Sequence, residues 1–239
     1  DRGATTDRRH KSMTPRADVT VRLATQRDVA GIVDLESRYF VDNLDESARA
    51  KGFISVLHSP HWFAAAVDSR GMHVAATTDG HIAGFIAVTD PPSRTSADLP
   101  PIVRAMLDIA DTIDVNGKKV AAQRWALRGP VCIDEAFRGG GIYGAFNAAT
   151  GNFYRDRYDI GVVFVAAENP RSLHTTTTKL GARSLAEFEV DSARYHFLVF
   201  DFGDPGQPVR LRRPLARGGD RQAVIESRLR HDTIGVEQP

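Results

Sequence analysis

The chain has 239 residues, of which 42% are hydrophobic and 26% charged, with 31 Lys and Arg against 30 Asp and Glu. This composition is typical of a globular chain and excludes wholesale disorder. The formal charge of +1 argues against a dedicated nucleic-acid binder, and no apolar run approaches the ~20 residues of a membrane span. The single cysteine, Cys132, excludes an internal disulfide. We therefore expect a cytoplasmic protein that contacts neither nucleic acid nor membrane.

Charge and composition divide the chain into three parts. Residues 1–18 hold five basic and three acidic residues and almost nothing apolar, which predicts a disordered arm. Residues 203–239 form an extension rich in Gly, Pro and Arg. Between them, residues 19–202 are expected to form a single domain. Residues 19–204 carry 19 basic and 23 acidic residues, a net charge of 19 − 23 = −4.

The first half of this domain predicts a strand, two helices and a hairpin. The strand covers 19–23, and Thr25 with Asp28 resembles a capping box that opens the first helix. The apolar residues of that helix recur at helical spacing: Val29, Ile32, Val33 and Leu35. Ser59 and Pro60 open a second helix that runs to Val67. Two apolar runs, 73–78 and 81–88, are separated by Asp79-Gly80, a dipeptide that favours a tight hairpin turn.

The second half predicts strands that alternate with helices. Residues 90–123 look like an insertion with one helix over 102–110. The elements that follow are a strand over 126–133, a helix over 142–154, an apolar strand over 160–166, a helix over 170–180 that Gly181 ends, and an antiparallel pair over 185–190 and 195–202. The helix over 142–154 is expected to present Ile142, Phe146, Ala149 and Phe153 on one face. This order predicts a mixed sheet covered by helices.

Three consecutive glycines follow Arg138, between the strand over 126–133 and the next helix. Glycines let the backbone approach a ligand closely, and a helix N-terminus carries about half a positive charge. The turn therefore suits a phosphate or pyrophosphate, to which Arg138 would add a charge-assisted bond.

Two other interpretations of this turn stay open. In the first, the turn is a flexible connection that binds no ligand. Residues 139–144 also match the dinucleotide fingerprint G-x-G-x-x-G, although that motif normally follows the first strand of repeated β-α-β units. A nucleotide-triphosphate P-loop is excluded because no Lys follows Gly144.

The turn resembles motif A of the GNAT superfamily, the acyl-CoA-dependent N-acyltransferases. Arg138 and Gly141 match its pattern of Arg or Gln, two residues, Gly, one residue, and Gly or Ala. Tyr143 occupies the last place, with Gly144 one step later. The resemblance covers residues 20–202 and includes the segments 21–28, 84–88, 169–173 and 179–181. It implies an α/β (α+β) fold with a mixed, mostly antiparallel central sheet of six to seven strands and about four flanking helices.

The resemblance further implies that acetyl-CoA serves as the acyl donor, without a metal. In the family, the glycine loop holds the CoA pyrophosphate, and the preceding strand contacts the pantetheine arm and the thioester carbonyl. Asn169 also fits a plain helix N-cap before Pro170. The expected CoA-binding residues are Val131, Cys132, Ile133, Arg138, Gly139, Gly140, Gly141, Ile142, Tyr143, Gly144, Asn169 and Ser172. We expect Gly141→Val to abolish CoA binding and to leave the fold largely intact.

The implied reaction transfers an acetyl group to a primary amine by direct attack in a ternary complex. Many relatives place a Tyr in the fourth helix, near the sulfur, where this chain has Thr176. Glu168 and His174 are the candidates for proton transfer, although a solvated carboxylate and an exposed histidine explain them as well. The missing Tyr keeps open a second function, a non-catalytic acyl-CoA-binding or regulatory module.

The acceptor is expected to be a small-molecule or peptide amine. Asp42, Asp45 and Glu46 form an acidic stretch that would suit a cationic amine, and solvated loop charge explains it equally well. His58 and His61 flank Pro60 with no carboxylate partner nearby, which argues against a metal site. The insertion is either a lid or a packing adjunct, and the sequence leaves a homodimer open.

Overall fold

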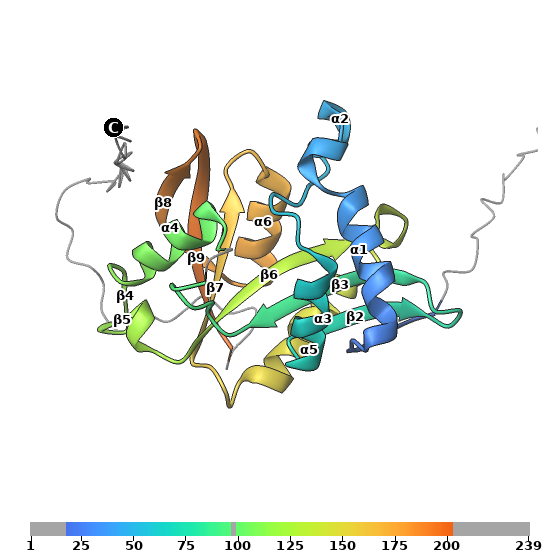
Figure 1. The fold of residues 1–239 in the computed structure, drawn as a ribbon, viewed down its shortest axis with the longest axis horizontal. Coiled ribbons are helices and arrows are strands. Elements are labelled where there is room, and N and C mark those ends of the chain that lie inside the picture. Colours follow the sequence, from blue (N-terminus) through green and yellow to red (C-terminus); the bar gives the residue numbers. More distant parts are fainter. Residues whose placement is uncertain (1–17, 97–98, 203–239) are drawn as a thin grey trace, which may run out of the picture.

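A sheet of seven strands runs through the molecule, in the order β1-β2-β3-β6-β7-β9-β8 (Figure 1). The structure, a computed structural model, describes residues 18–96 and 99–202. The predicted N-terminal arm, apart from Asp18, lies outside these described residues, and so does the whole predicted C-terminal extension. Neighbouring strands pair antiparallel except β6 and β7, which pair parallel. The predicted fold class, a mixed and mostly antiparallel sheet with flanking helices, is confirmed.

The elements follow the predicted order, with small additions. The first half contains β1 (Val19–Leu23), α1 (Val29–Arg38), the single turn α2 (Glu46–Arg49), α3 (Pro60–Asp68), β2 (Met72–Thr77) and β3 (Ile82–Thr89). The second half contains α4 (Pro101–Ala110), β4 (Asp114–Val115), β5 (Lys118–Lys119), β6 (Trp125–Ile133), α5 (Ile142–Tyr154), β7 (Ile160–Ala166), α6 (Pro170–Lys179), β8 (Arg183–Val190) and β9 (Ala193–Asp201). None of the described helices has the length and apolar character needed to cross a bilayer.

The predicted caps fix the start of the first two long helices. The Asp28 carboxylate accepts hydrogen bonds from the Thr25 amide at 2.7 Å and from both ends of the Arg22 guanidinium at 2.7 and 2.8 Å. The bond to Arg22, followed by those to Thr25, lowers the pKa of Asp28 to about 2. The Ser59 hydroxyl accepts from the Trp62 amide at 3.1 Å. Both caps bind amide groups that the first helical turn leaves free.

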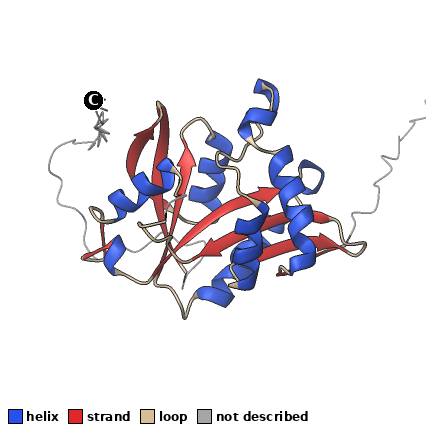
Figure 2. Ribbon diagram, in the orientation of Figure 1, coloured by secondary structure: helices blue, strands red, loops and turns tan. Residues whose placement is uncertain are grey.

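Helices cover both faces of the sheet (Figure 2). One face carries α5 and α6 over a single core cluster that includes Phe146, Val163 and Phe200. The opposite face carries two separate clusters. One lies beneath α1 and α3 and includes Phe63, Phe85 and Cys132, and the other lies beneath α4 and includes Met106, Val162 and Phe197. Alternate residues of β7 enter clusters on opposite faces, as the two-residue period of a strand requires.

The prediction for α5 was wrong in one position. Phe153, which we expected on the buried face, is exposed, and the neighbouring Tyr154 is buried instead. The buried face continues from Ile142 and Phe146 through Thr150 to Tyr154, a four-residue spacing. The Tyr154 hydroxyl donates to the Arg70 carbonyl, so burial leaves no unpaired polar group there.

The insertion packs on the sheet. Ile102, Met106 and Leu107 of α4 are buried in the core cluster that also contains residues of β7 and β9. This arrangement favours the packing role over the lid. The N-terminal end of α4 nevertheless reaches the cavity described below, through Leu99, Pro100 and Val103.

Candidate active site

The strands β6 and β7 separate and open a cavity in the middle of the sheet. They pair only over Trp125–Leu127 and Ile160–Val162. Beyond Leu127, β6 pairs with β3 alone, across an irregularity in register between Ile86 and Val88, while β7 pairs with β9 alone. The facing edges of the two strands therefore carry backbone groups without a strand partner. They line a cavity of about 1250 Å³ that reaches residues on both faces of the sheet.

The glycine turn lies at one end of this cavity, where β6 leads into α5. The amides of Gly139, Gly141, Ile142, Tyr143 and Gly144 have no hydrogen-bond acceptor among the described residues. Gly140 differs, because its amide donates to the Phe137 carbonyl at 3.3 Å and it does not line the cavity. No side chain caps α5, and its first residues line the cavity, so the positive end of the helix borders the cavity.

Gly141 and Gly144 keep this end of α5 open. Gly141 has a φ of +86°, a conformation that glycine adopts without strain. A Cβ atom built on either glycine would meet no atom within 4 Å. The space beside the free amides is therefore available to a ligand.

The segment from α1 to α2 braces the turn from outside. Arg138 donates to the carbonyls of Ile133 and Lys51, both at 2.9 Å, and its guanidinium lies 4.9 Å from the centre of the Tyr39 ring. Lys51 also pairs with Glu135 at 2.9 Å. These contacts fix the turn before any ligand arrives, which lowers the ordering cost of binding.

The charges that line the cavity are mostly positive, although the predicted domain is net negative. Among the described lining residues there is one acid, Asp90, and there are five cations: Lys51, Arg128, Arg138, Arg171 and Lys179. Such a surface attracts an anionic ligand and stabilises it once bound.

Arg128 supplies the most deeply buried of these charges. It is 2% exposed, and its guanidinium donates to the Asn147 side chain at 2.9 Å and lies 5.2 Å from the centre of the Tyr143 ring. Its Nε and the Tyr143 hydroxyl are buried and have no hydrogen-bond partner among the described residues. A cation buried without a carboxylate is costly, so an anion or a carbonyl group in the cavity would stabilise this position.

One side of α6 forms the opposite wall of the cavity. Ser172, Thr175, Thr176 and Lys179 line it at helical spacing. Asn169, which is buried, caps α6 by accepting from the Ser172 amide at 3.1 Å and donates to the Phe53 carbonyl at 2.9 Å. The N-cap role considered for Asn169 is therefore observed.

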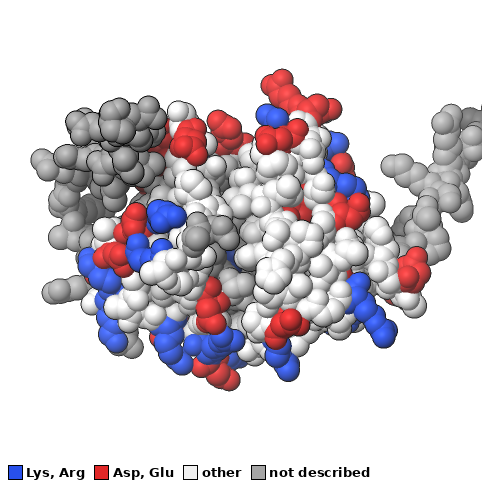
Figure 3. Space-filling view, in the orientation of Figure 1, with Lys and Arg blue, Asp and Glu red and all other residues white. Residues whose placement is uncertain are grey.

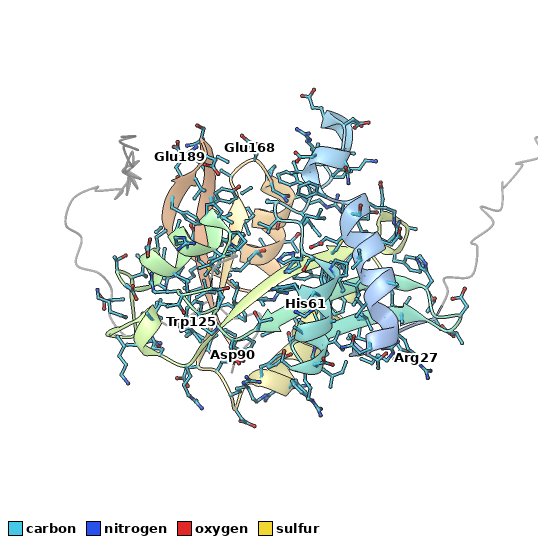
Figure 4. The ribbon with its side chains drawn as sticks, viewed as in Figure 1. Arg27, His61, Asp90, Trp125, Glu168 and Glu189 are labelled. Carbon is cyan, nitrogen blue, oxygen red and sulfur yellow. The ribbon has the colours of Figure 1, made fainter. Side chains whose placement is uncertain are left out.

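Of the twelve residues predicted to bind CoA, all but Gly140 line this one cavity. The two candidates for proton transfer do not. Glu168 is exposed in the loop after β7 and points outward at the upper edge of the molecule (Figure 4). His174 is exposed on α6. The structure thus gathers the predicted binding residues but leaves both predicted catalytic side chains outside the cavity.

The part of the cavity on the face that carries α1, α3 and α4 is mainly apolar. Its lining includes Val56, Leu57, Trp62, Leu99, Val103 and Phe164. In the space-filling view, charged side chains lie mostly around the rim of this face and its centre is largely uncharged (Figure 3). Asp42, Asp45 and Glu46 do not line the cavity, and Asp45 instead caps α2 through the Ala48 amide at 2.8 Å. The acidic wall considered for a cationic amine is therefore absent from the described lining.

His58 has a carboxylate partner, so the expectation of none nearby was wrong. Its Nδ1 lies 2.7 Å from Glu36 Oε1, and its backbone amide donates to Glu36 Oε2 at 3.0 Å. Glu36 lies 22 residues earlier, on α1, and packing of α1 against α3 brings the two together. Among the described residues, no group of three or more His, Cys, Asp and Glu is arranged to hold a metal ion.

Cys132 is buried in the core beneath α1 and α3, as a small apolar residue would be. Burial raises the pKa of its thiol to about 12, so the reactive thiolate is scarce at neutral pH. We predict that a thiol reagent such as 5,5′-dithiobis(2-nitrobenzoate) modifies no cysteine in the native protein at pH 8. The same reagent should report one thiol per chain in guanidinium chloride. Rapid modification without denaturant would contradict the burial of Cys132.

The sheet order, the separated strands and the glycine turn at the start of α5 are those of a GNAT fold. No family model matches the sequence, and no curated protein matches it either. Solved structures do match. One is yncA from Salmonella typhimurium with its cofactor acetyl-CoA, at 14% identity and a TM-score of 0.53, covering 80% of this chain and 98% of that one.

Two further structures show the same fold. A GNAT-family acetyltransferase from Streptococcus agalactiae is 15% identical, with a TM-score of 0.52, and the match covers 77% of this chain and 95% of that chain. The NatC complex bound to Gag peptide and CoA contains a chain that is 12% identical, with a TM-score of 0.51, covering 77% of this chain and 98% of that one. This protein therefore has the fold of the GNAT superfamily.

Proposed function

We propose that this protein is an N-acetyltransferase, which transfers an acetyl group from acetyl-CoA to a primary amine by direct attack in a ternary complex. The observation that carries the proposal is the set of amides at the start of α5 that have no acceptor among the described residues, in a cavity whose described lining includes five cations and one acid. CoA carries three phosphate groups, and its pyrophosphate suits amides at a helix N-terminus. The solved neighbours that hold acetyl-CoA or CoA add support from outside the chain.

The separated strands suit a two-substrate reaction. In the proposal, CoA enters between α5 and α6 and lays its pantetheine arm along the open edge of β6, at Val131, Cys132 and Ile133. Backbone amides on that edge would stabilise the negative charge that develops on the thioester oxygen. The acceptor amine would enter from the opposite face, so the cavity holds the reacting atoms in line. The acceptor is a small molecule or a peptide, and the location is cytoplasmic.

Acetyl-CoA binding and turnover test the proposal in two stages. Acetyl-CoA at about a hundred times its Kd should stabilise the fold by about 2.7 kcal/mol, which a thermal unfolding experiment resolves. NAD at the same concentration should have no effect. Turnover is then followed as thiol release with a panel of primary amines, with product masses to confirm amide formation.

The outcomes separate the competing functions. Binding with turnover supports the enzyme. Binding of acetyl-CoA without amide formation on a broad panel favours the non-catalytic acyl-CoA-binding or regulatory module. Stabilisation by NAD and not by acetyl-CoA would overturn both. EDTA should leave the rate unchanged, because the proposed chemistry uses no metal.

A further inference from the structure

We propose that His58, oriented by Glu36, accepts the proton from the attacking amine, and that this amine is carried on an apolar or aromatic body. This inference rests on the proposed function and deepens it. It assigns a proton acceptor from outside the pair of residues that the sequence suggested. His58 would be a catalytic residue, and Glu36 a positioning residue that acts through it.

The Glu36–His58 pair has the geometry of an oriented base. Glu36 is 0% exposed and contacts both the ring Nδ1 and the backbone amide of His58. A buried carboxylate requires hydrogen-bond donors, so we assign the proton of the neutral ring to Nδ1. The lone pair then resides on Nε2, which has no hydrogen-bond partner among the described residues. A carboxylate that selects the tautomer in this way leaves the distal nitrogen ready to accept a proton.

The ring lines the same cavity as the strand that would hold the thioester. His58 lines the cavity and packs on Trp62 at 4.1 Å and on Phe63 at 5.7 Å between ring centres. Phe63 in turn contacts Phe85 at 5.7 Å, and Phe85 pairs with Cys132 of β6. This chain of contacts places His58 on the acceptor side of β6, across the sheet from α5. Glu36 of α1 is the charged group in contact with the ring, and α3 presents the two aromatic rings. His61, in the first turn of α3 (Figure 4), also lines the cavity.

The surroundings of His58 indicate the class of acceptor. Val56, Leu57, Trp62, Leu99, Val103 and Phe164 line this half, and Leu57, next to His58, is 52% exposed. Asp90 is the single acid among the described lining residues. Such walls favour an acceptor with one amine on an apolar or aromatic body over a polyamine with several charges, because each additional buried charge would lack a partner.

The proton balance of the step is simple. The amine nitrogen forms a bond to the carbonyl carbon, the carbon–sulfur bond breaks, and CoA leaves as a thiolate. His58 Nε2 takes a proton from the nitrogen and releases it to solvent, and the thiolate gains a proton from solvent. The ring is unchanged after each turnover.

Variants of the pair test the proton transfer. His58→Gln should lower kcat at least 100-fold, within the usual range for loss of a general base, with acetyl-CoA affinity within two-fold of wild type. It should also remove the acidic limb of the pH–rate profile. Glu36→Gln should lower kcat at least ten-fold and leave KM for acetyl-CoA unchanged. His81→Gln, a histidine substitution outside the cavity lining, should behave as wild type in every assay.

The ring itself provides a readout that needs no turnover. Nitrogen-15 spectra of the histidines, assigned with His58→Gln, should show His58 protonated on Nδ1 and unprotonated on Nε2 when neutral. The Glu36→Gln variant should lose this preference while keeping a folded spectrum. A neutral His58 that carries its proton on Nε2 in the wild type would overturn the positioning role.

The acceptor class and the proposed function are tested separately. Phenethylamine should have a kcat/KM at least ten-fold higher than spermidine, and the reverse order would overturn the acceptor class. If the wild type acetylates amines and His58→Gln keeps kcat within two-fold, the proposed function stands and the proton transfer falls. If the wild type binds acetyl-CoA and acetylates no amine, the proposed function fails first and the catalytic role of His58 falls with it.

Discussion

Replacement of Gly144 by leucine should weaken CoA binding at least 100-fold and leave the protein at least as stable as the wild type. Gly144 lies in the first turn of α5, lines the cavity, and has open space where a Cβ would stand. Leucine favours a helix over glycine by roughly 0.5–1 kcal/mol, so the fold does not oppose the change. Its side chain would occupy the space in which we place the pyrophosphate, beside the free amides.

Isothermal titration with CoA and a thermal melt measure the two effects on one sample. Ala148→Leu is the matched control, since Ala148 is an exposed residue of α5 outside the cavity lining. That control should bind CoA with wild-type affinity. If Gly144→Leu is folded and binds CoA with wild-type affinity, the pyrophosphate does not bind at the start of α5. The main support for the proposed N-acetyltransferase activity would then be lost.

Gly144→Leu is a cleaner test of the phosphate site than Gly141→Val, the substitution that the sequence suggested. Gly141→Val was expected to leave the fold largely intact, but the φ of Gly141 is +86°. A left-handed conformation costs an L residue roughly 1–2 kcal/mol, and a β-branched residue fits it worst. Loss of CoA binding in Gly141→Val could therefore come from backbone strain or from obstruction of the phosphate site. Gly144 does not have a positive φ, so Gly144→Leu tests obstruction alone.

Local signals in the sequence were sufficient for the elements and for the glycine turn. The caps at Asp28 and Ser59, and the glycines after Arg138, act over a few residues, so the sequence predicts them directly. The shape of the cavity was not predictable in this way. It depends on where β6 and β7 cease to pair, which is set by long-range packing on both faces.

The Glu36–His58 pair shows what a sequence pattern can conceal. Glu36 lies on α1 and His58 in the loop before α3, and neither lies in a motif. One signal was present: Glu36 follows Ile32 by four residues, so it falls on the apolar face of α1. A carboxylate on a buried helix face requires a partner. The sequence could not name His58 as that partner, because the contact depends on how α3 packs against α1.

The wild-type protein should lose about 3 kcal/mol of folding stability between pH 6.5 and pH 4 because of His73. This residue lies on β2, is 4% exposed, and has an Nδ1 without a hydrogen-bond partner among the described residues. Burial lowers its pKa from 6.5 to about 4. In that interval the unfolded chain binds a proton that the folded chain refuses, so stability falls as pH falls. This lowering of the pKa from 6.5 to about 4 corresponds to roughly 3 kcal/mol, and the loss is complete below pH 4.

His73→Phe isolates this effect, because the ring already packs edge to face against Phe153 and Tyr154 at 5.5 and 5.9 Å. Urea unfolding at intervals from pH 7 to pH 4 should show the variant gaining about 3 kcal/mol relative to wild type as the pH falls. Asp28 does not interfere, since its lowered pKa of about 2 removes stability only below pH 3.8. His73→Leu repeats the test should Phe pack poorly. Parallel pH curves for wild type and both variants would show that the folded protein accommodates a charged His73, and the burial argument for β2 would then be wrong.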